Sequence, residues 1–254
     1  MKGFVATTLS ILLFSCVQQP DNLPSIEAPS LMLDTIEGVA AGTLLRAELA
    51  SEFLPARPLD IWLPSSYDGT QKHNVLYMYD AQMLFDATTT WNGQEWRVDE
   101  ILDSLITDDV ITPTIVVALY NGGQRRNFEY FPEKPAAQLQ AAFSDSVLSE
   151  ISKRYGADST FIVNSDNYLR YMVEEVKPII DGQFQVQTSA ASTAIMGSSM
   201  GGLMSMYAVG EYPSVYGTAL CMSTHWPGGF APNEEIPAVF NAYVKQNIIP
   251  ERVG

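Results

Sequence analysis

A serine flanked by glycines lies between an apolar run and a run of helix-forming residues. The segment Gly197-Ser198-Ser199-Met200-Gly201 has the pattern Gly-x-Ser-x-Gly, and apolar residues precede and follow it. A strand, a sharp turn and a helix in this order place the central serine at the apex of a strained turn, with its hydroxyl exposed. The pattern alone arises often by chance, but this context is much rarer. We therefore predict that Ser199 is a nucleophile.

The same turn predicts a site that stabilises negative charge. A helix that begins directly after Ser199 has free N–H groups and a positive dipole end at its N-terminus. The N–H of Met200 would point to the place where a carbonyl attacked by Ser199 becomes an oxyanion. This combination favours acyl-transfer chemistry.

Strand and helix signals alternate along residues 31–254, which predicts one α/β domain with a mostly parallel sheet and helices on both faces. In such sheets the ligand site lies beyond the carboxyl ends of the strands. We therefore expect chemistry in the segments 80–94, 121–131, 197–201 and 223–230. The expected strands cover residues 42–49, 58–64, 74–79, 114–120, 193–198 and 217–222, and the expected helices cover 95–106, 135–155, 166–180, 200–211 and 236–246.

Composition argues against several classes of partner. The chain has 14 basic and 29 acidic residues and a formal net charge of −15, so nucleic acid and anionic membrane surfaces would be repelled. It has two histidines and no Cys/His cluster with metal-ligand spacing, so we expect no metal and no cofactor. Cys221 lies in an apolar run and is interpreted as a buried small side chain.

The N-terminus is predicted to be a targeting segment rather than part of the fold. Residues 1–15 have the short apolar stretch of a signal peptide, and Leu13-Phe14-Ser15-Cys16 resembles a lipoprotein lipobox. We expect a lipid on Cys16, a polar, Pro-containing tether over 16–30, and an outer-membrane-anchored lipoprotein, periplasmic or at the cell surface. The lipid anchor would be its only contact with a membrane. The alternative is an ordinary secretory signal or an uncleaved anchor.

Three motifs together resemble one protein family. They are Leu59-Asp-Ile-Trp-Leu-Pro64, Val75-Leu-Tyr-Met-Tyr-Asp-Ala-Gln-Met-Leu-Phe-Asp86 and Ile195-Met-Gly-Ser-Ser-Met-Gly-Gly202. They resemble the enterochelin-esterase-like and esterase-D-like branch of the α/β hydrolases, which includes feruloyl, acetyl-xylan and siderophore esterases and mycolyltransferases. The resemblance implies a serine esterase that acts through an acyl-enzyme on Ser199.

The resemblance also implies a second oxyanion donor in the loop after the 74–79 strand, from the backbone of Ala81 or Gln82. This loop usually reads His-Asp-Gly-Gln in the family, whereas here Ala81 takes the place of glycine. A positive φ at that position would cost an alanine about 1 kcal/mol. The candidate substrate-binding residues are Asp80, Arg125, His225 and Trp226.

A catalytic triad also needs an acid and a base. In this fold they follow later strands than the serine does. His225 is the only histidine after Ser199, and it follows the very next strand. It can be interpreted as a pocket-lining residue or as a substitute base. We expect the usual acid, the usual base and the final strands to lie beyond Gly254.

Several other residues have two interpretations. Four aromatic residues could pack in the core or line an acyl or sugar pocket: Trp91, Trp96, Phe128 and Tyr130. Arg125, Arg126 and Glu129 could form an exposed charged loop or bind a polar substrate, and His73 is expected in a solvated turn.

The sequence as a whole predicts a secreted serine esterase that cleaves small carboxylic esters, either acyl or feruloyl groups on carbohydrate or a siderophore-type ester. Two alternatives remain open: a non-catalytic ligand-binding protein that keeps the fold, and an acyltransferase on the same scaffold. A serine peptidase is less favoured, because no segment suggests a peptide-binding subdomain.

Overall fold

A computed structural model describes residues 30–139, 145, 149, 163–228 and 233–249. The predicted signal peptide, Cys16 and nearly all of the predicted tether lie outside the described residues, as does most of the predicted 135–155 helix. In the part of the chain that is described, no helix is both long and apolar enough to cross a bilayer.

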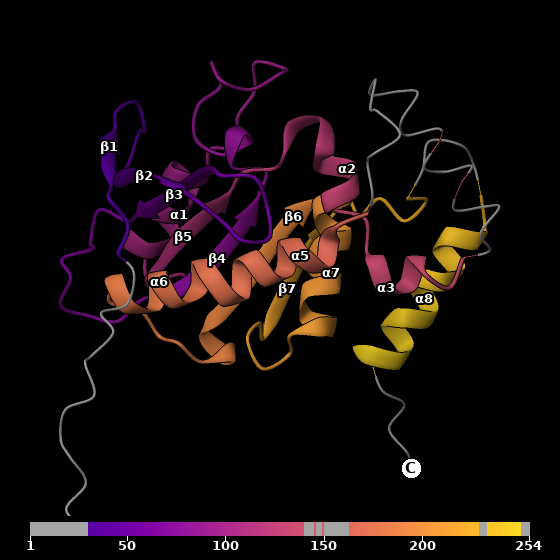
Figure 1. The fold of residues 1–254 in the computed structure, drawn as a ribbon. Coiled ribbons are helices and arrows are strands. Elements are labelled where there is room, and N and C mark those ends of the chain that lie inside the picture. Colours follow the sequence, from indigo (N-terminus) through magenta and orange to yellow (C-terminus); the bar gives the residue numbers. More distant parts are fainter. Residues whose placement is uncertain (1–29, 140–144, 146–148, 150–162, 229–232, 250–254) are drawn as a thin grey trace, which may run out of the picture.

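The core of the fold is one seven-stranded sheet with the order β1-β2-β3-β5-β4-β6-β7 (Figure 1). The pairings β5-β4, β4-β6 and β6-β7 are parallel, and β1, β2 and β3 add an antiparallel section. The predicted strands are present, and β1 is an addition to them. The strands are β1 (Asp34–Ile36), β2 (Thr43–Leu49), β3 (Arg57–Leu63), β4 (Asn74–Tyr79), β5 (Thr114–Leu119), β6 (Thr193–Ser198) and β7 (Thr218–Met222).

Four of the predicted helices, over 95–106, 166–180, 200–211 and 236–246, are present with bounds shifted by a few residues, and the short helices α2 and α3 were not predicted. The predicted 166–180 helix is one continuous segment in which a π-helical stretch separates α5 from α6. The helices are α1 (Val98–Thr107), α2 (Arg126–Glu129), α3 (Glu133–Ala136), α5 (Ser165–Arg170), the π-helical η3 (Tyr171–Val176), α6 (Lys177–Gln183), α7 (Met200–Glu211) and α8 (Glu235–Asn247), with 3₁₀ turns η1 (Ala81–Met83), η2 (Gly123–Arg125) and η4 (Ala190–Ser192).

Alternation along the strands divides the hydrophobic core into two layers. In β4, Tyr77 and Tyr79 belong to the larger cluster, which includes residues of α5, α6, α7 and α8. Met78, between them, belongs to the smaller cluster with residues of α1. Successive side chains of a strand point to opposite faces, so the sheet has α1 on one side and the other long helices on the opposite side.

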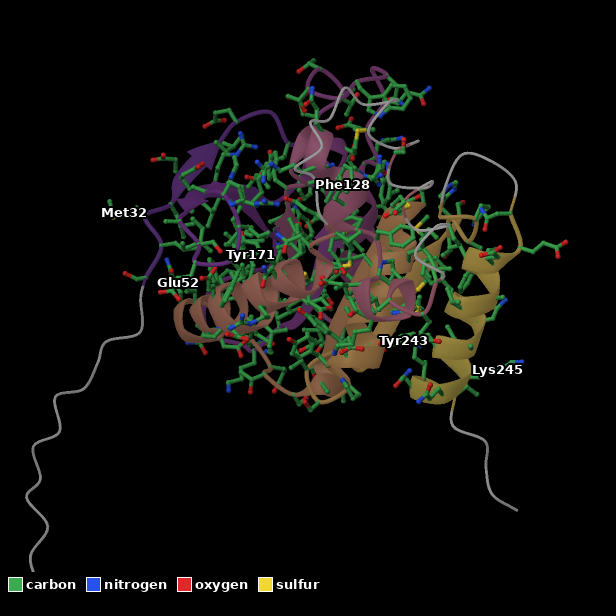
Figure 2. The ribbon with its side chains drawn as sticks, turned by 45° about the vertical axis from the view of Figure 1, so that its right-hand side comes forward. Met32, Glu52, Phe128, Tyr171, Tyr243 and Lys245 are labelled. Carbon is green, nitrogen blue, oxygen red and sulfur yellow. The ribbon has the colours of Figure 1, made fainter. Side chains whose placement is uncertain are left out.

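Helix α8 is attached to α7 by a polar contact at the edge of the larger cluster. The Tyr243 hydroxyl donates a 2.6 Å hydrogen bond to Oε1 of Glu211, and Glu211 also pairs with Lys134. Figure 2 shows Tyr243 on the side of α8 toward the body of the protein and Lys245 on the outer side. Tyr243 is buried and Lys245 is exposed, which agrees with this orientation.

Two predictions about single residues are wrong. His73 is buried rather than solvated, because it continues β4 by a bridge to Val186 and its ring contacts that of Tyr67. Cys221 is exposed rather than buried, because β7 lies at the edge of the sheet that the structure describes.

Candidate active site

Ser199 occupies a strained turn between β6 and α7. Its backbone angles are φ 58° and ψ −116°, and α7 begins at the next residue, Met200. This region of φ/ψ space is sparsely populated for residues with a side chain and costs about 1–3 kcal/mol. The surrounding structure must therefore hold Ser199 in place, as expected for the nucleophile turn that the sequence predicted.

Two glycines, Gly197 and Gly202, make this turn possible because other atoms approach them closely. A Cβ on Gly197 would lie 2.5 Å from the carbonyl oxygen of Gly201. A Cβ on Gly202 would lie 2.8 Å from the Thr224 hydroxyl oxygen, in the loop after β7. The strand, the helix and the following loop thus pack together at distances that only glycine permits.

Backbone hydrogen bonds connect the serine turn to the loop after β7. The N–H of Ser199 donates to the Met222 carbonyl at 3.0 Å, and the N–H of His225 donates to the Ser199 carbonyl at 3.1 Å. His225 and Trp226 therefore lie beside the candidate nucleophile, and Trp226 is 37% exposed. Among the described residues, the Ser199 hydroxyl makes no hydrogen bond. The hydrogen bond between Ser199 and His225 joins backbone groups of the two residues.

Two helical N-termini meet at the same edge of the sheet. Met200 is the first residue of α7 and Ala81 is the first residue of η1, so neither N–H has an acceptor inside its own helix. A Cβ on Gly201 would be 3.4 Å from the Tyr79 Cβ, which places the loop after β4 against the first turn of α7. This arrangement suits the predicted oxyanion donors Met200 and Ala81, with Gln82 following in η1.

The left-handed residue of this loop is Asp80 and not Ala81. Asp80 has φ 61° and ψ 47°, whereas Ala81 does not have a positive φ. Aspartate tolerates this conformation better than most residues. The cost considered for alanine at position 81 therefore does not arise.

The Asp80 carboxylate is occupied by protein groups. Arg126 donates two hydrogen bonds to it, from Nε to Oδ1 and from Nη2 to Oδ2, both at 2.7 Å, and Asn121 Nδ2 donates to Oδ1 at 2.7 Å. The sequence predicted a substrate-binding role for Asp80 and did not predict these partners. They connect the loops that follow the adjacent strands β4 and β5.

The segment after β5 is helical rather than the exposed charged loop that was one of the two interpretations. Glu129 is 2% exposed and accepts hydrogen bonds from Arg57 at 2.9 and 3.0 Å and from the Gly122 N–H at 2.9 Å. Arg125 is exposed at the end of η2. Of the three charged residues, Arg125 is exposed, Arg126 is partly buried and Glu129 is buried.

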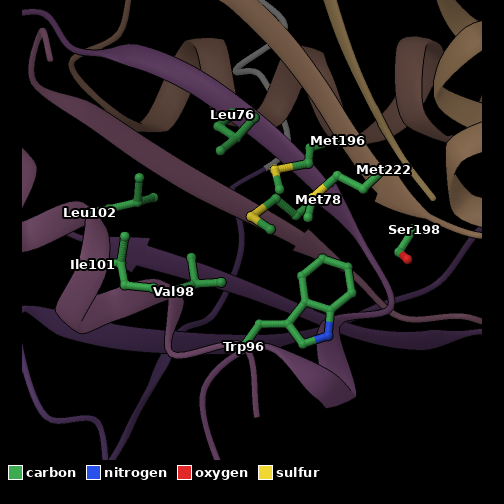
Figure 3. A pocket seen from close by; sticks show the side chains of 9 residues that line it. All are labelled: Leu76, Met78, Trp96, Val98, Ile101, Leu102, Met196, Ser198 and Met222. Carbon is green, nitrogen blue, oxygen red and sulfur yellow. The ribbon is translucent and has the colours of Figure 1, made fainter.

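An apolar hollow of about 460 Å³ lies on the α1 side of the sheet (Figure 3). Ser198 and Trp96 are two of its lining residues, and Met222 is a third. The other aromatic candidates lie elsewhere: Phe128 and Tyr130 are buried in the larger cluster, and Trp91 is 87% exposed. The described residues contain no group of three or more His, Cys, Asp or Glu side chains that could hold a metal ion.

The fold and the serine turn are those of an α/β hydrolase. Residues 55–242 match the protein family named "Putative esterase", so the chain belongs to that esterase family.

Two proteins are similar to this chain, one in sequence and one in fold. The uncharacterized protein YbbA of Bacillus subtilis is 24% identical over 174 residues, which are 68% of this chain and 58% of YbbA. An IroE-like serine hydrolase from Shewanella oneidensis has a TM-score of 0.56 at 20% identity, covering 79% of this chain and 56% of that one.

A feruloyl esterase module from Clostridium thermocellum, solved with sinapinate, has a TM-score of 0.52 at 15% identity, covering 87% of this chain and 68% of the module. The chain thus spans less than two thirds of YbbA and of the Shewanella hydrolase.

Proposed function

We propose that the protein is a serine esterase that forms an acyl-enzyme on Ser199. The observation that carries this proposal is the conformation of Ser199 at the N-terminus of α7, with φ 58°. Membership of the esterase family supports the same chemistry.

The reaction begins when the Ser199 Oγ attacks the ester carbonyl carbon, while its proton passes to a base. The carbonyl oxygen becomes an oxyanion that accepts hydrogen bonds from the Met200 N–H and from the N–H of Ala81 or Gln82. Each donor of this kind contributes about 3–4 kcal/mol to transition-state stabilisation. The alcohol then leaves with a proton, and water hydrolyses the acyl-enzyme to release the acid and restore Ser199.

We propose a small carboxylic ester as substrate, either an acyl or feruloyl group on carbohydrate or a siderophore-type ester. The similarity in fold to a feruloyl esterase module and to an IroE-like serine hydrolase supports this class. In this proposal Arg125, His225 and Trp226 contact the substrate. His225 and Trp226 lie beside Ser199, and Arg125 is exposed at the end of η2, in the segment after β5.

The experiment that tests the proposal is reaction with a fluorophosphonate, followed by peptide mapping. Modification of Ser199, together with hydrolysis of p-nitrophenyl acetate that is lost in Ser199→Ala, supports the esterase. A folded wild-type protein that neither reacts nor hydrolyses the ester contradicts it and favours the ligand-binding alternative. Preferential transfer of the acyl group to an added alcohol rather than to water would favour the acyltransferase.

We also propose that the mature protein carries a lipid on Cys16, on the basis of the segment Leu13-Phe14-Ser15-Cys16. Cells supplied with an alkyne-bearing fatty acid should label the wild-type protein and fail to label Cys16→Ala. Equal labelling of the two would contradict lipidation at Cys16.

A further inference from the structure

A buried carboxylate lies beside the N-terminus of α7. Asp80 is 5% exposed, and its Oδ2 would be 3.5 Å from a Cβ on Gly201, the second residue of the helix. A helix N-terminus bears the equivalent of about half a positive charge and stabilises an anion placed there. In the proposed reaction the oxyanion forms at this same helix end. Two negative charges would then share one stabilising dipole.

Arg126 compensates the first of these charges. Its guanidinium donates two hydrogen bonds to the Asp80 carboxylate, both at 2.7 Å. The Arg126 side chain is 26% exposed and the Asp80 side chain is 7% exposed. Two-point contacts of this type fix the orientation of both groups. Asn121 donates a further hydrogen bond but brings no charge.

The residue held by this contact also precedes the η1 turn. Asp80 has a left-handed conformation, and η1 starts at the following residue with the Met83 N–H donating to the Asp80 carbonyl at 2.8 Å. The direction of the Ala81 N–H is set by the conformation of Asp80. Arg126 holds both carboxylate oxygens of Asp80, so the Asp80 side chain has little freedom to move. A fixed side chain helps to keep the Asp80 backbone in its left-handed conformation.

We propose that Arg126 is a positioning residue for the esterase reaction, acting through Asp80. It neutralises the carboxylate next to the N-terminus of α7 and holds the loop that presents the Ala81 N–H. This inference rests on the proposed function. In this role Arg126 and Asp80 adjust the charge and the backbone position around the oxyanion site and do not contact the substrate.

A purely structural ion pair would give a different result from an electrostatic one when both partners are removed. In Arg126→Gln, the Asp80 carboxylate remains without its counter-charge next to the developing oxyanion. In the double variant Asp80→Asn/Arg126→Gln, that charge is gone and a hydrogen bond between the two amides remains feasible. The electrostatic role therefore predicts that the second substitution restores kcat of the folded protein, whereas a loss of structure alone predicts that it restores thermal stability and the folded fraction but leaves kcat of the folded protein unchanged.

The experiment compares these variants in full-length protein with p-nitrophenyl acetate and with a fluorophosphonate. We expect Arg126→Gln to lower kcat about 10- to 100-fold with KM changed less than about threefold, since an oxyanion interaction acts on the transition state. The double variant should recover about tenfold. Arg126→Lys, which keeps the charge, should fall between wild type and Arg126→Gln.

The control is Arg170→Gln, which removes an exposed two-point pair with Glu174 on α5 and η3. It should keep wild-type kcat. Circular dichroism and thermal unfolding establish that each variant is folded. If Arg126→Gln does not fold, the kcat of Arg126→Lys is compared with that of the double variant to test the role of Arg126.

The outcomes separate the two proposals. Two outcomes overturn the role of Arg126 and leave the esterase proposal intact, provided that the wild type reacts with the fluorophosphonate. In the first, Arg126→Gln has the kcat of wild type. In the second, the double variant is no more active than Arg126→Gln. When Arg126→Gln does not fold, a double variant less active than Arg126→Lys by more than tenfold overturns the role of Arg126 as well. A wild type inert to both reagents overturns the esterase proposal, and with it the inference.

Discussion

Gly197 and Gly201 face each other across the serine turn so closely that a Cβ on Gly197 would lie 2.5 Å from the Gly201 carbonyl oxygen. The contact is with backbone atoms of α7, which cannot move aside without displacing the helix from the sheet. The proximity of these two residues is therefore what brings the end of β6 and the start of α7 together at Ser199.

Substitution Gly197→Ala should destabilise the protein by about 3 kcal/mol, because the added methyl group overpacks this junction. Gly93→Ala is the matched control: Gly93 has φ 67° but open space around it, so the change should cost only about 1 kcal/mol. Denaturant unfolding measures both values. Equal costs for the two substitutions would show that the close approach does not constrain the turn.

The buried pair of Arg57 and Glu129 should be among the most sensitive polar contacts of the fold. Both residues are nearly inaccessible, and removal of one partner leaves an uncompensated buried charge. We expect Arg57→Met to lower the free energy of unfolding by about 3–5 kcal/mol. Arg97→Ala, which breaks an exposed pair with Glu100, should cost less than about 1 kcal/mol. A similar cost for both would contradict the importance of burial.

The attachment of α8 should depend on the Tyr243 hydroxyl. Tyr243→Phe removes a 2.6 Å hydrogen bond to Glu211 and should lower stability by about 1.5–3 kcal/mol, the range for hydrogen bonds to charged groups. Amide hydrogen exchange in residues 235–247 should accelerate, while Lys245→Ala on the outer side of α8 should leave exchange unchanged. Unaltered exchange in Tyr243→Phe would argue that apolar packing alone holds this helix.

Asp99 should make stability dependent on pH. Burial raises the pKa of Asp99, whose Oδ2 accepts a 2.7 Å hydrogen bond from the Ala40 N–H and whose neighbour Glu100 adds negative charge. A carboxyl group with a raised pKa in the folded state stabilises the protein below its unfolded pKa, about 3.9, and this contribution is lost as pH rises through the folded pKa.

Asp99→Asn should therefore gain stability relative to wild type as the pH rises above about 4, because the amide stays neutral. The measurement is the difference in unfolding free energy between the two proteins at each pH. A difference that does not change with pH would contradict the assigned direction of the shift.

The central part of the fold follows from local sequence. The strands β4 and β6 and helix α7 are recognisable because an apolar run of strand length, a glycine-flanked serine and a helix-forming run are each coded by neighbouring residues. Strand β1 was not predicted, since its three residues are mostly exposed and have no apolar alternation.

The polar partners around the site could not be predicted in the same way. Asp80 and Arg126 are 46 residues apart, and Arg57 and Glu129 are 72 residues apart. Such pairs depend on which loops the strand order brings together, and a single charged residue in a loop carries no signal of a buried partner. For Asp80, the one available signal was its place directly after a buried strand.

The most direct test of Ser199 as the nucleophile is the identity of the residue that reacts with a fluorophosphonate in the full-length protein. An acyl-enzyme on Ser199 predicts a single modified peptide with the label on this serine, and no labelling or ester hydrolysis above background in a folded Ser199→Ala variant. Labelling of another serine, or hydrolysis that persists unchanged in Ser199→Ala, would contradict the assignment of Ser199 as the nucleophile.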